Sequence, residues 1–270
     1  MVRNPAVAGQ FYPDKREELS LEIERLTGRV PAKKEDALGL LLPHAGYAYS
    51  GAVAASTLAA VNPRPTYIIV GPNHTGLGQP FSISTSDYWK TPLGDVKIDG
   101  KLTDRILKDC ELIRKDEFAH IHEHSIEVQL PFLQKFCGAF TFVPIVVAQA
   151  GIDIYQKIGL SLARSIKELG MDKAVSIIAS SDMTHYETQK SARDKDSRAL
   201  EAIVKLDETA LVERVRELDI SMCGFAPAAI MIAAVKVLGA KKARVIKYQT
   251  SGDVTGDNSS VVGYAGVIIN

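Results

Sequence analysis

Four short apolar runs constrain the fold most strongly. Residues 37–42 (ALGLLL), 67–70 (YIIV), 140–147 (FTFVPIVV) and 174–179 (AVSIIA) contain almost no polar side chains. A strand that is buried on both faces has this kind of sequence, whereas a strand with one solvated face alternates between apolar and polar residues. We therefore expect the four runs to form the inner strands of one sheet.

The apolar runs are separated by segments with helical patterning. Helices are expected at residues 20–26, 51–61, 102–109, 124–136, 155–169, 192–204, 208–218 and 227–238. Further strands are expected at 243–249 and 261–269, and residues 82–97 alternate as in a hairpin or an edge excursion. Neighbouring parallel strands need crossover connections of this kind. The pattern predicts an α/β fold, a three-layer αβα sandwich with a largely parallel central sheet, in a single domain over residues 1–270.

Charge and apolar length argue against several classes of function. Lysine plus arginine and aspartate plus glutamate both number 32, so no net field attracts nucleic acid or an anionic membrane. A basic cluster near the C-terminus is interpreted as a solvated surface; it consists of Lys241, Lys242, Arg244 and Lys247. No apolar run approaches the roughly 20 residues that span a bilayer, and the N-terminus lacks an apolar stretch of signal-peptide length. We expect a cytoplasmic protein that binds neither nucleic acid nor a membrane.

Three histidines follow three of the expected inner strands. His44, His74 and His185 each come within a few residues of the carboxyl end of an apolar run. In open α/β sheets, ligands bind beyond the carboxyl ends of the strands. A single loop histidine is more often only a hydrogen-bonded loop residue, but three at equivalent positions favour a metal-binding cleft, provided that the strands are parallel neighbours.

The third ligand of such a site remains open on the residues alone. Two imidazoles and one anionic side chain leave free positions on a divalent metal, as in non-haem iron and catalytic zinc sites. The anion could come from Asp182, Glu127 or Cys223. The three cysteines are odd in number and widely spaced, which does not indicate a disulfide framework. Cys223 precedes an expected helix, whose N-terminus would lower the pKa of the thiol and favour the thiolate; the alternative is a small buried apolar residue.

A histidine-rich stretch apart from these three histidines is harder to interpret. Residues 118–124 (FAHIHEH) resemble a metal-binding cluster whose alternating histidines would share one face of a strand. A solvated surface run explains this stretch equally well. His124 and Glu127 are three residues apart and would share one face of a helix. We assign these two residues, with Asn73 directly before His74, to the surroundings of the ligands or to the pocket wall.

Six motifs, in order along the chain, carry a family resemblance. They are NPAVAGQFYP, PHAGYAYSG, VGPNHTG, EHSIEVQLPFL, SSDMTHYE and MCGFAP, and the chain closes with GDNSSVVGYAG. Together they resemble the Memo family, also called AmmeMemoRadiSam system protein B, over nearly the whole length. The resemblance implies a fold similar to that of the class III extradiol dioxygenases, non-haem iron enzymes that cleave catechol-type rings.

The resemblance also implies roles for individual residues. In the dioxygenases two histidines and a glutamate hold iron, whereas the matching ligands of the Memo family are two histidines and a cysteine. Carried over by motif, these ligands are His44, His74 and Cys223. The acid/base position falls on His185, with Asp182 placed to orient it. A thiolate in place of a carboxylate shifts the metal preference toward copper or zinc, so ring cleavage is not implied.

The resulting hypothesis is a metal-dependent oxidoreductase of dioxygenase ancestry whose substrate is unidentified. Iron is the favoured divalent metal, with copper or zinc as alternatives. Tyr47, Tyr49 and Trp89 could wall an aromatic or peptide-sized pocket, or they could be core aromatics. Two other hypotheses are a non-enzymatic module that binds a peptide or phosphopeptide in the same cleft, and a protein that handles iron or copper reversibly. The resemblance further implies radical SAM and AMMECR-type proteins as partners.

Overall fold

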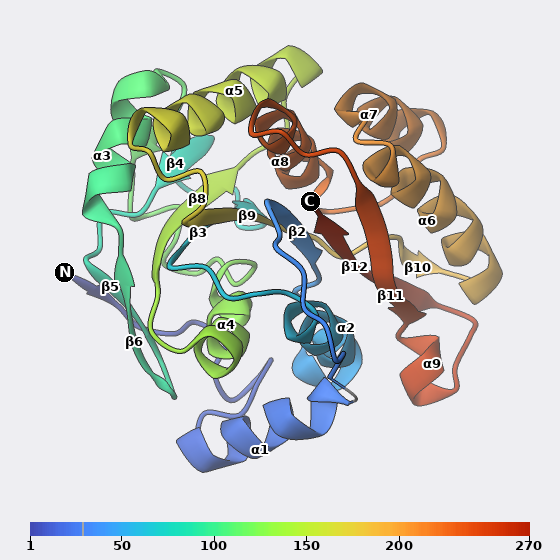
Figure 1. Ribbon diagram of the computed structural model, residues 1–270. Helices are drawn as coiled ribbons and strands as arrows, with labels where there is room; N and C mark the ends of the chain where they lie inside the picture. Colours follow the sequence, from blue (N-terminus) through green and yellow to red (C-terminus); the bar gives the residue numbers. More distant parts are fainter. Residues whose placement is uncertain (29) are drawn as a thin grey trace.

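The computed structural model describes residues 1–28 and 30–270, and a 12-stranded mixed sheet runs through its centre (Figure 1). The strands are β1 (Val2–Arg3), β2 (Gly39–Leu42), β3 (Thr66–Pro72), β4 (Phe81–Ile83), β5 (Tyr88–Thr91), β6 (Gly94–Ile98), β7 (Arg114–Lys115), β8 (Thr141–Val147), β9 (Val175–Ser180), β10 (His185–Glu187), β11 (Ala243–Thr250) and β12 (Val261–Ile269). The helices are α1 (Arg16–Thr27), α2 (Tyr47–Ala59), α3 (Gly100–Asp109), the 3-10 helix η1 (Glu127–Gln129), α4 (Leu130–Cys137), α5 (Ile152–Glu168), α6 (Gln189–Val204), α7 (Glu208–Glu217), α8 (Phe225–Val237) and α9 (Gly252–Thr255).

The four predicted inner strands form the parallel centre of the sheet. Their order is β8-β3-β9-β2, and each neighbouring pair is parallel. The strands at either side are mixed in direction: β12 is antiparallel to β2 and to β11, while β5 and β6 form an antiparallel hairpin. The predicted α/β sandwich is thus confirmed, with parallel pairing concentrated in the middle.

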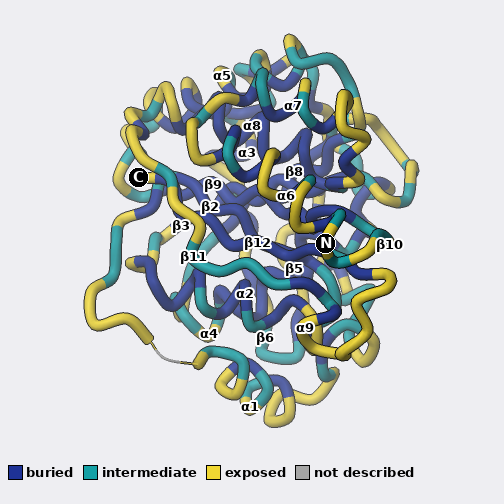
Figure 2. Tube along the Cα trace, turned by 90° about the vertical axis from the view of Figure 1, so that its right-hand side faces the viewer, coloured by how far each residue is buried: buried dark blue, intermediate teal, exposed yellow. Residues whose placement is uncertain are grey.

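Helices cover both faces of the sheet. Helices α3, α5 and α8 lie over one face, and α1, α2 and α4 lie over the other (Figure 1). Successive residues of β2 point to opposite cores, because Leu41 packs with the first group of helices and Leu40 and Leu42 pack with the second. Figure 2 shows these inner strands as buried, with the exposed residues on the outer helices and loops. This two-sided burial explains why the apolar runs do not alternate.

The expected helix at residues 124–136 is shorter than its pattern indicates. A 3-10 turn at Glu127–Gln129 leads into α4 at Leu130–Cys137, so Pro131 stands in the first turn of α4 rather than inside a longer helix. Proline is tolerated there because the first amides of a helix have no partner within it. Residue 124 is in no regular element, and residues 125–126 form a turn ahead of these helices.

Over the described residues, no helix combines the length and apolar character needed to cross a membrane.

Candidate metal centre

The carboxyl ends of the four parallel strands form one rim of the sheet. Leu42 of β2 pairs with Ser180 at the end of β9, and Pro72 of β3 pairs with Val147 at the end of β8. The loops that follow these strands therefore start side by side. Two of these loops bring His44 and His74 to the rim, and Cys223 reaches it from the segment ahead of α8. The ligand atoms of the three residues all lie within 4.8 Å of one another.

Ser180 fixes the orientation of the His44 imidazole. The Ser180 hydroxyl donates to the Ser125 carbonyl at 2.6 Å and accepts from Gln129 Nε2 at 2.9 Å, so it can only accept from His44 Nδ1, which lies 2.9 Å away. The proton of His44 is therefore on Nδ1. Its Nε2 presents a lone pair toward Cys223 Sγ, 3.1 Å away.

Glu123 plays the corresponding part for His74. Its carboxylate lies 3.0 Å from His74 Nδ1 and also accepts from the His74 amide at 2.7 Å. Burial alone would raise the pKa of Glu123, but the hydrogen bond and charge of His74 and the Ser125 amide lower it to about 2. A carboxylate that receives the Nδ1 proton leaves Nε2 free for a metal, which is the common arrangement around metal-binding histidines.

Two glycines allow these groups to approach one another. A Cβ on Gly71 would lie 2.4 Å from Ser125 Oγ, so the glycine lets the segment with Glu123 and Ser125 pack against β3. A Cβ on Gly224 would lie 2.3 Å from the Ser180 carbonyl oxygen, so this glycine lets the start of α8 sit on the end of β9. The second contact brings Cys223 to the histidines.

The thiol of Cys223 is held by main-chain contacts. The Asp182 amide donates to Sγ at 3.3 Å. Burial, and then the charge of Asp182, raise the pKa of Cys223. The expectation that the following helix lowers this pKa is therefore wrong, because loss of solvent outweighs the N-terminus of α8. Without a cation the thiol stays protonated, so the thiolate requires a metal or another positive charge.

His124 adds a third imidazole to the centre. Its ring stacks on His74 with centroids 4.8 Å apart and meets His44 edge-on at 5.4 Å. His74, Glu123 and His124 form a second group whose ligand atoms are close enough to hold a metal. Burial lowers the pKa of His124 and, well below the ordinary value, that of His44, so these imidazoles are neutral and able to act as ligands.

The histidine-rich run at residues 118–124 is only partly a solvated surface. His120 and Glu123 are fully buried and His124 is largely buried, while His122 is exposed. The segment forms turns rather than a strand, so its histidines do not share one face. The surface alternative fails for Glu123 and His124 because this end of the run leads into Ser125, which packs against β3 where Gly71 leaves room.

His185 lies at the same rim but has a different orienting partner from the one expected. Its Nδ1 is 2.9 Å from the Ser221 carbonyl, which can only accept, and its amide donates to Ser221 Oγ at 2.7 Å. Nε2 of His185 is therefore the unprotonated nitrogen. The Asp182 carboxylate instead accepts from the His44 amide at 2.8 Å, and burial raises the pKa of Asp182 to about 6. In the described chain Ser221, rather than Asp182, orients His185.

Comparison with known proteins identifies the family. The model of the Memo-like protein family matches residues 3–268. The chain belongs to the Memo-like family. A MEMO1 family protein of Methanosarcina mazei is 44% identical over 269 residues, which cover 99% of each chain. Another, from Aquifex aeolicus, is 43% identical over 268 residues and covers 99% of this chain and 98% of its own.

A solved structure supports the fold of this Memo-like chain. An uncharacterised protein of Escherichia coli K12 superposes with a TM-score of 0.56 over 85% of this chain and 98% of its own, at 14% identity. At this identity the likeness concerns the fold alone.

Several residues predicted for the cleft serve the Memo-like core instead. The Glu127 carboxylate pairs with Arg3 at 2.7 Å and accepts from Tyr12 Oη at 2.7 Å. Tyr47 is buried, stacks on Phe132 with centroids 4.2 Å apart and donates to a main-chain carbonyl.

The other three residues predicted for the pocket wall lie in different surroundings. Trp89 is fully buried beneath the guanidinium of Arg3, which lies 4.1 Å from the ring centroid. Tyr49 is 43% exposed. Asn73 shapes the loop of His74 by accepting from the Gly76 amide at 2.9 Å.

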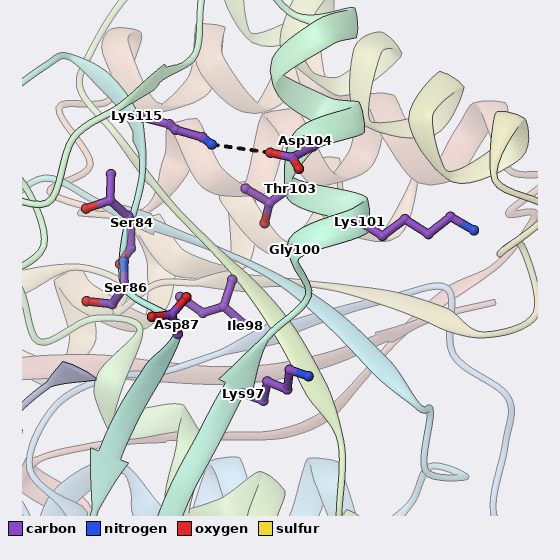
Figure 3. Close-up of a pocket in the computed structure, with 11 residues that line it drawn as sticks. Ser84, Ser86, Asp87, Lys97, Ile98, Gly100, Lys101, Thr103, Asp104 and Lys115 are labelled. Carbon is purple, nitrogen blue, oxygen red and sulfur yellow. Dashed lines mark hydrogen bonds and ion pairs between the residues drawn. The ribbon is translucent and has the colours of Figure 1, made fainter. Parts of the chain in front are cut away.

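A hollow of about 500 Å³ between β6 and α3 lies apart from this chemistry (Figure 3). Lysines and hydroxyl residues line it, and Lys115 pairs across it with Asp104 at 3.2 Å. None of its lining residues belongs to the histidine and cysteine group. The rim of the sheet, not this hollow, carries the candidate site.

Proposed function

We propose that the protein binds one divalent transition metal through His44 Nε2, His74 Nε2 and Cys223 Sγ and acts as a metal-dependent oxidoreductase. The observation that carries the proposal is the pair of Nδ1 anchors. Ser180 and Glu123 each receive the Nδ1 proton of one imidazole, so both Nε2 lone pairs are free beside the same sulfur. Two imidazoles and a sulfur that can ionise suit iron, copper or zinc rather than magnesium or calcium.

Iron is the metal we favour, with copper or zinc as alternatives. Three protein ligands leave coordination positions open, as in catalytic rather than structural sites. A bound redox metal would supply electron transfer to or from the substrate. The surrounding residues would keep the ligands in place.

His185 is proposed to move a proton. Its Nδ1–H is engaged by the Ser221 carbonyl, so Nε2 is the nitrogen that accepts a proton. An imidazole is suited to proton transfer around neutral pH. This assignment makes His185 an acid/base group and not a ligand.

Metal content with an absorption spectrum tests the proposal directly. Protein purified and reconstituted without oxygen should hold about one metal per chain, and iron or copper should give a thiolate charge-transfer band. His44→Ala and Cys223→Ala should lose the metal, whereas Cys137→Ala, which changes another free cysteine, should retain it. A wild-type protein that holds no metal after reconstitution would contradict both the oxidoreductase and the metal-handling hypotheses.

The role of His185 has a narrower test. His185→Ala should retain the metal and lose oxygen consumption with a catechol probe in an oxygen electrode. Loss of metal from this variant would make His185 a ligand. If the wild type consumes oxygen with catechol and His185→Ala retains both the metal and this oxygen consumption, His185 has no proton-transfer role.

The proposal includes a cytoplasmic location, which suits the three free thiols. The radical SAM and AMMECR-type partners implied by the family resemblance stay a prediction.

A further inference from the structure

A hollow of about 420 Å³ opens beside Cys223. Its lining residues come from the loop after β8, the end of α7 and the segment before α8: Gln149, Ala150, Val215, Arg216, Asp219, Ile220, Ser221, Met222, Cys223 and Phe225. Because β8 ends at the same rim as β3 and β9, the hollow adjoins the candidate metal centre. Ser221, which holds His185, is part of its wall. A molecule in the hollow would thus lie next to a proposed ligand, Cys223, and next to Ser221, the residue that holds the proposed proton acceptor.

Three of the lining residues, which we call the floor of the hollow, are apolar. Ile220, Met222 and Phe225 are each less than 10% exposed, and the Phe225 ring packs edge-on against Tyr155 with centroids 6.1 Å apart. Rigid apolar walls with a few polar groups are typical of small-molecule sites, and this volume is in their usual range. The floor therefore suits a ring-sized apolar body.

Arg216 is the one cation among the lining residues. Its Nη2 donates to the Ala150 carbonyl at 3.2 Å, and no carboxylate of the described chain lies within ion-pair distance of the guanidinium. Arg214, two residues earlier on α7, pairs instead with Glu201 at 3.0 Å. Since a guanidinium presents several N–H groups in a planar fork, Arg216 keeps donors that match a planar carboxylate.

Asp219 limits the charge that the hollow can accept. Asp219 is also a lining residue of the hollow. Its φ is 49°, a left-handed conformation that aspartate and asparagine tolerate better than most residues. One positive and one negative side chain suit a monoanion that reaches Arg216. A phosphate dianion would meet Asp219, and the lining residues include no second cation to offset it.

We propose that this hollow binds the carboxylate end of the substrate, a small organic monoacid whose apolar body lies on Phe225 and whose carboxylate pairs with Arg216. This site adds a substrate class to the proposed function, and it rests on that function only for the metal chemistry beside the hollow. Arg216 is a specificity residue in this assignment and takes no part in proton transfer.

Benzoate is a suitable probe, with benzyl alcohol as a neutral analogue and phenyl phosphate as a dianionic one. Binding is followed by ligand-observed NMR on the wild-type protein with and without Zn²⁺. Benzoate should bind better than either analogue. Arg216→Gln should weaken benzoate binding at least tenfold in both metal states, whereas Arg114→Gln, at an exposed arginine on β7, should leave it unchanged. Asp219→Asn should tighten benzoate binding severalfold, because it removes a like charge.

Three results would overturn the inference: equal benzoate affinity in wild type and Arg216→Gln, equal affinity for benzyl alcohol, or preference for phenyl phosphate. Benzoate binding that needs Zn²⁺ and ignores Arg216 would mean direct binding to the metal, and would overturn it as well. Zinc content is measured on the same samples. If the wild type binds benzoate but takes up no zinc, and Arg216→Gln no longer binds benzoate, the result would contradict the metal centre and still support the carboxylate site.

Discussion

The hydrogen bonds behind the two imidazoles decide which nitrogen faces the centre. Ser180 and Glu123 both accept from Nδ1, but only Glu123 carries a charge. A charged acceptor raises the basicity of the imidazole and holds its ring more firmly than a hydroxyl does. The Glu123 contact should therefore contribute more to metal affinity than the Ser180 contact.

Glu123→Gln tests this contribution. We expect metal affinity to fall roughly 10- to 100-fold, because glutamine gives His74 a weaker acceptor and no charge. The affinity is measured by competition with a chromophoric zinc chelator. The matched control is Glu111→Gln, at an exposed carboxylate, which should bind zinc as the wild type does. An unchanged affinity in Glu123→Gln would show that the charge of Glu123 contributes nothing to metal binding.

His120 should make the stability of the protein depend on pH. Burial lowers its pKa from 6.5 to about 4, so the native state keeps it neutral where the unfolded chain binds a proton. Proton binding by the unfolded chain therefore lowers the free energy of unfolding as the pH falls below 6.5, and at about pH 4 the loss reaches roughly 3 kcal/mol.

The comparison variant is His120→Gln, studied in metal-free protein by urea unfolding. Its free energy of unfolding should fall less steeply between pH 6.5 and pH 4 than that of the wild type. Equal slopes in the two proteins would mean that His120 titrates normally in the fold.

Part of the centre was predictable at this scale. His44, His74 and Cys223 come together as the strand-end rule and the family motifs indicated. The supporting residues were not predictable, because Ser180 and Glu123 act through contacts between distant segments. Glu123 stands in a run that reads as solvent-exposed, and only its position directly before His124 hinted at a site.

At the scale of elements, the start of α8 must touch the end of β9 for the centre to form. The Gly224 amide donates to Ser181 Oγ at 3.0 Å, and the absence of a side chain at Gly224 permits the approach. Helix α8 itself is apolar around most of its circumference and packs between α5, α7 and the sheet. Packing in the core thus sets the position of α8, and the missing side chain at Gly224 allows Cys223 to lie close to His44.

Gly224→Ala should disturb both stability and metal binding. Its Cβ would meet main-chain atoms of β9, which cannot move aside, so we expect a loss of about 2 kcal/mol and weaker zinc binding. Urea unfolding and chelator competition measure the two effects. Gly100→Ala, where a Cβ meets nothing within 4 Å, is the control and should leave both quantities near the wild-type values.

Element types followed from the sequence better than their directions and ends did. Burial on both faces produced the apolar runs of β2, β3 and β9, which made the parallel centre predictable. The antiparallel direction of β12 depends on the chain returning beside β2, which no local pattern encodes. The start of α4 was misjudged because Pro131 fits either a first turn or a kink.

At the scale of the whole molecule, the N-terminal segment is fastened across the fold. Glu127 accepts from Arg3, from the amides of Ala6 and Val7 and from Tyr12. Arg3 also donates to the His120 and Glu123 carbonyls. The beginning of the chain therefore holds the segment that carries Glu123 and His124.

Arg3→Leu should reveal this coupling. Removing one partner leaves the Glu127 carboxylate buried without its cation, so we expect a loss of about 3 kcal/mol in the free energy of unfolding. Zinc binding should weaken as well, because the Glu123 segment loses its anchor. The exposed pair of Lys15 and Glu18 offers a control, since Lys15→Met should not shift the urea midpoint. A stable Arg3→Leu protein with normal zinc affinity would contradict the coupling.

Each proposed ligand stands on its own loop, after a separate parallel strand or ahead of α8. A substitution in one loop can change one donor atom while the sheet and the other donors stay in place. Cys223→Glu, for example, would convert the donor set into two imidazoles and a carboxylate. Such a protein would be a starting point for laboratory evolution of new metal reactivity, because a donor atom can be exchanged without changing the residues on which folding depends.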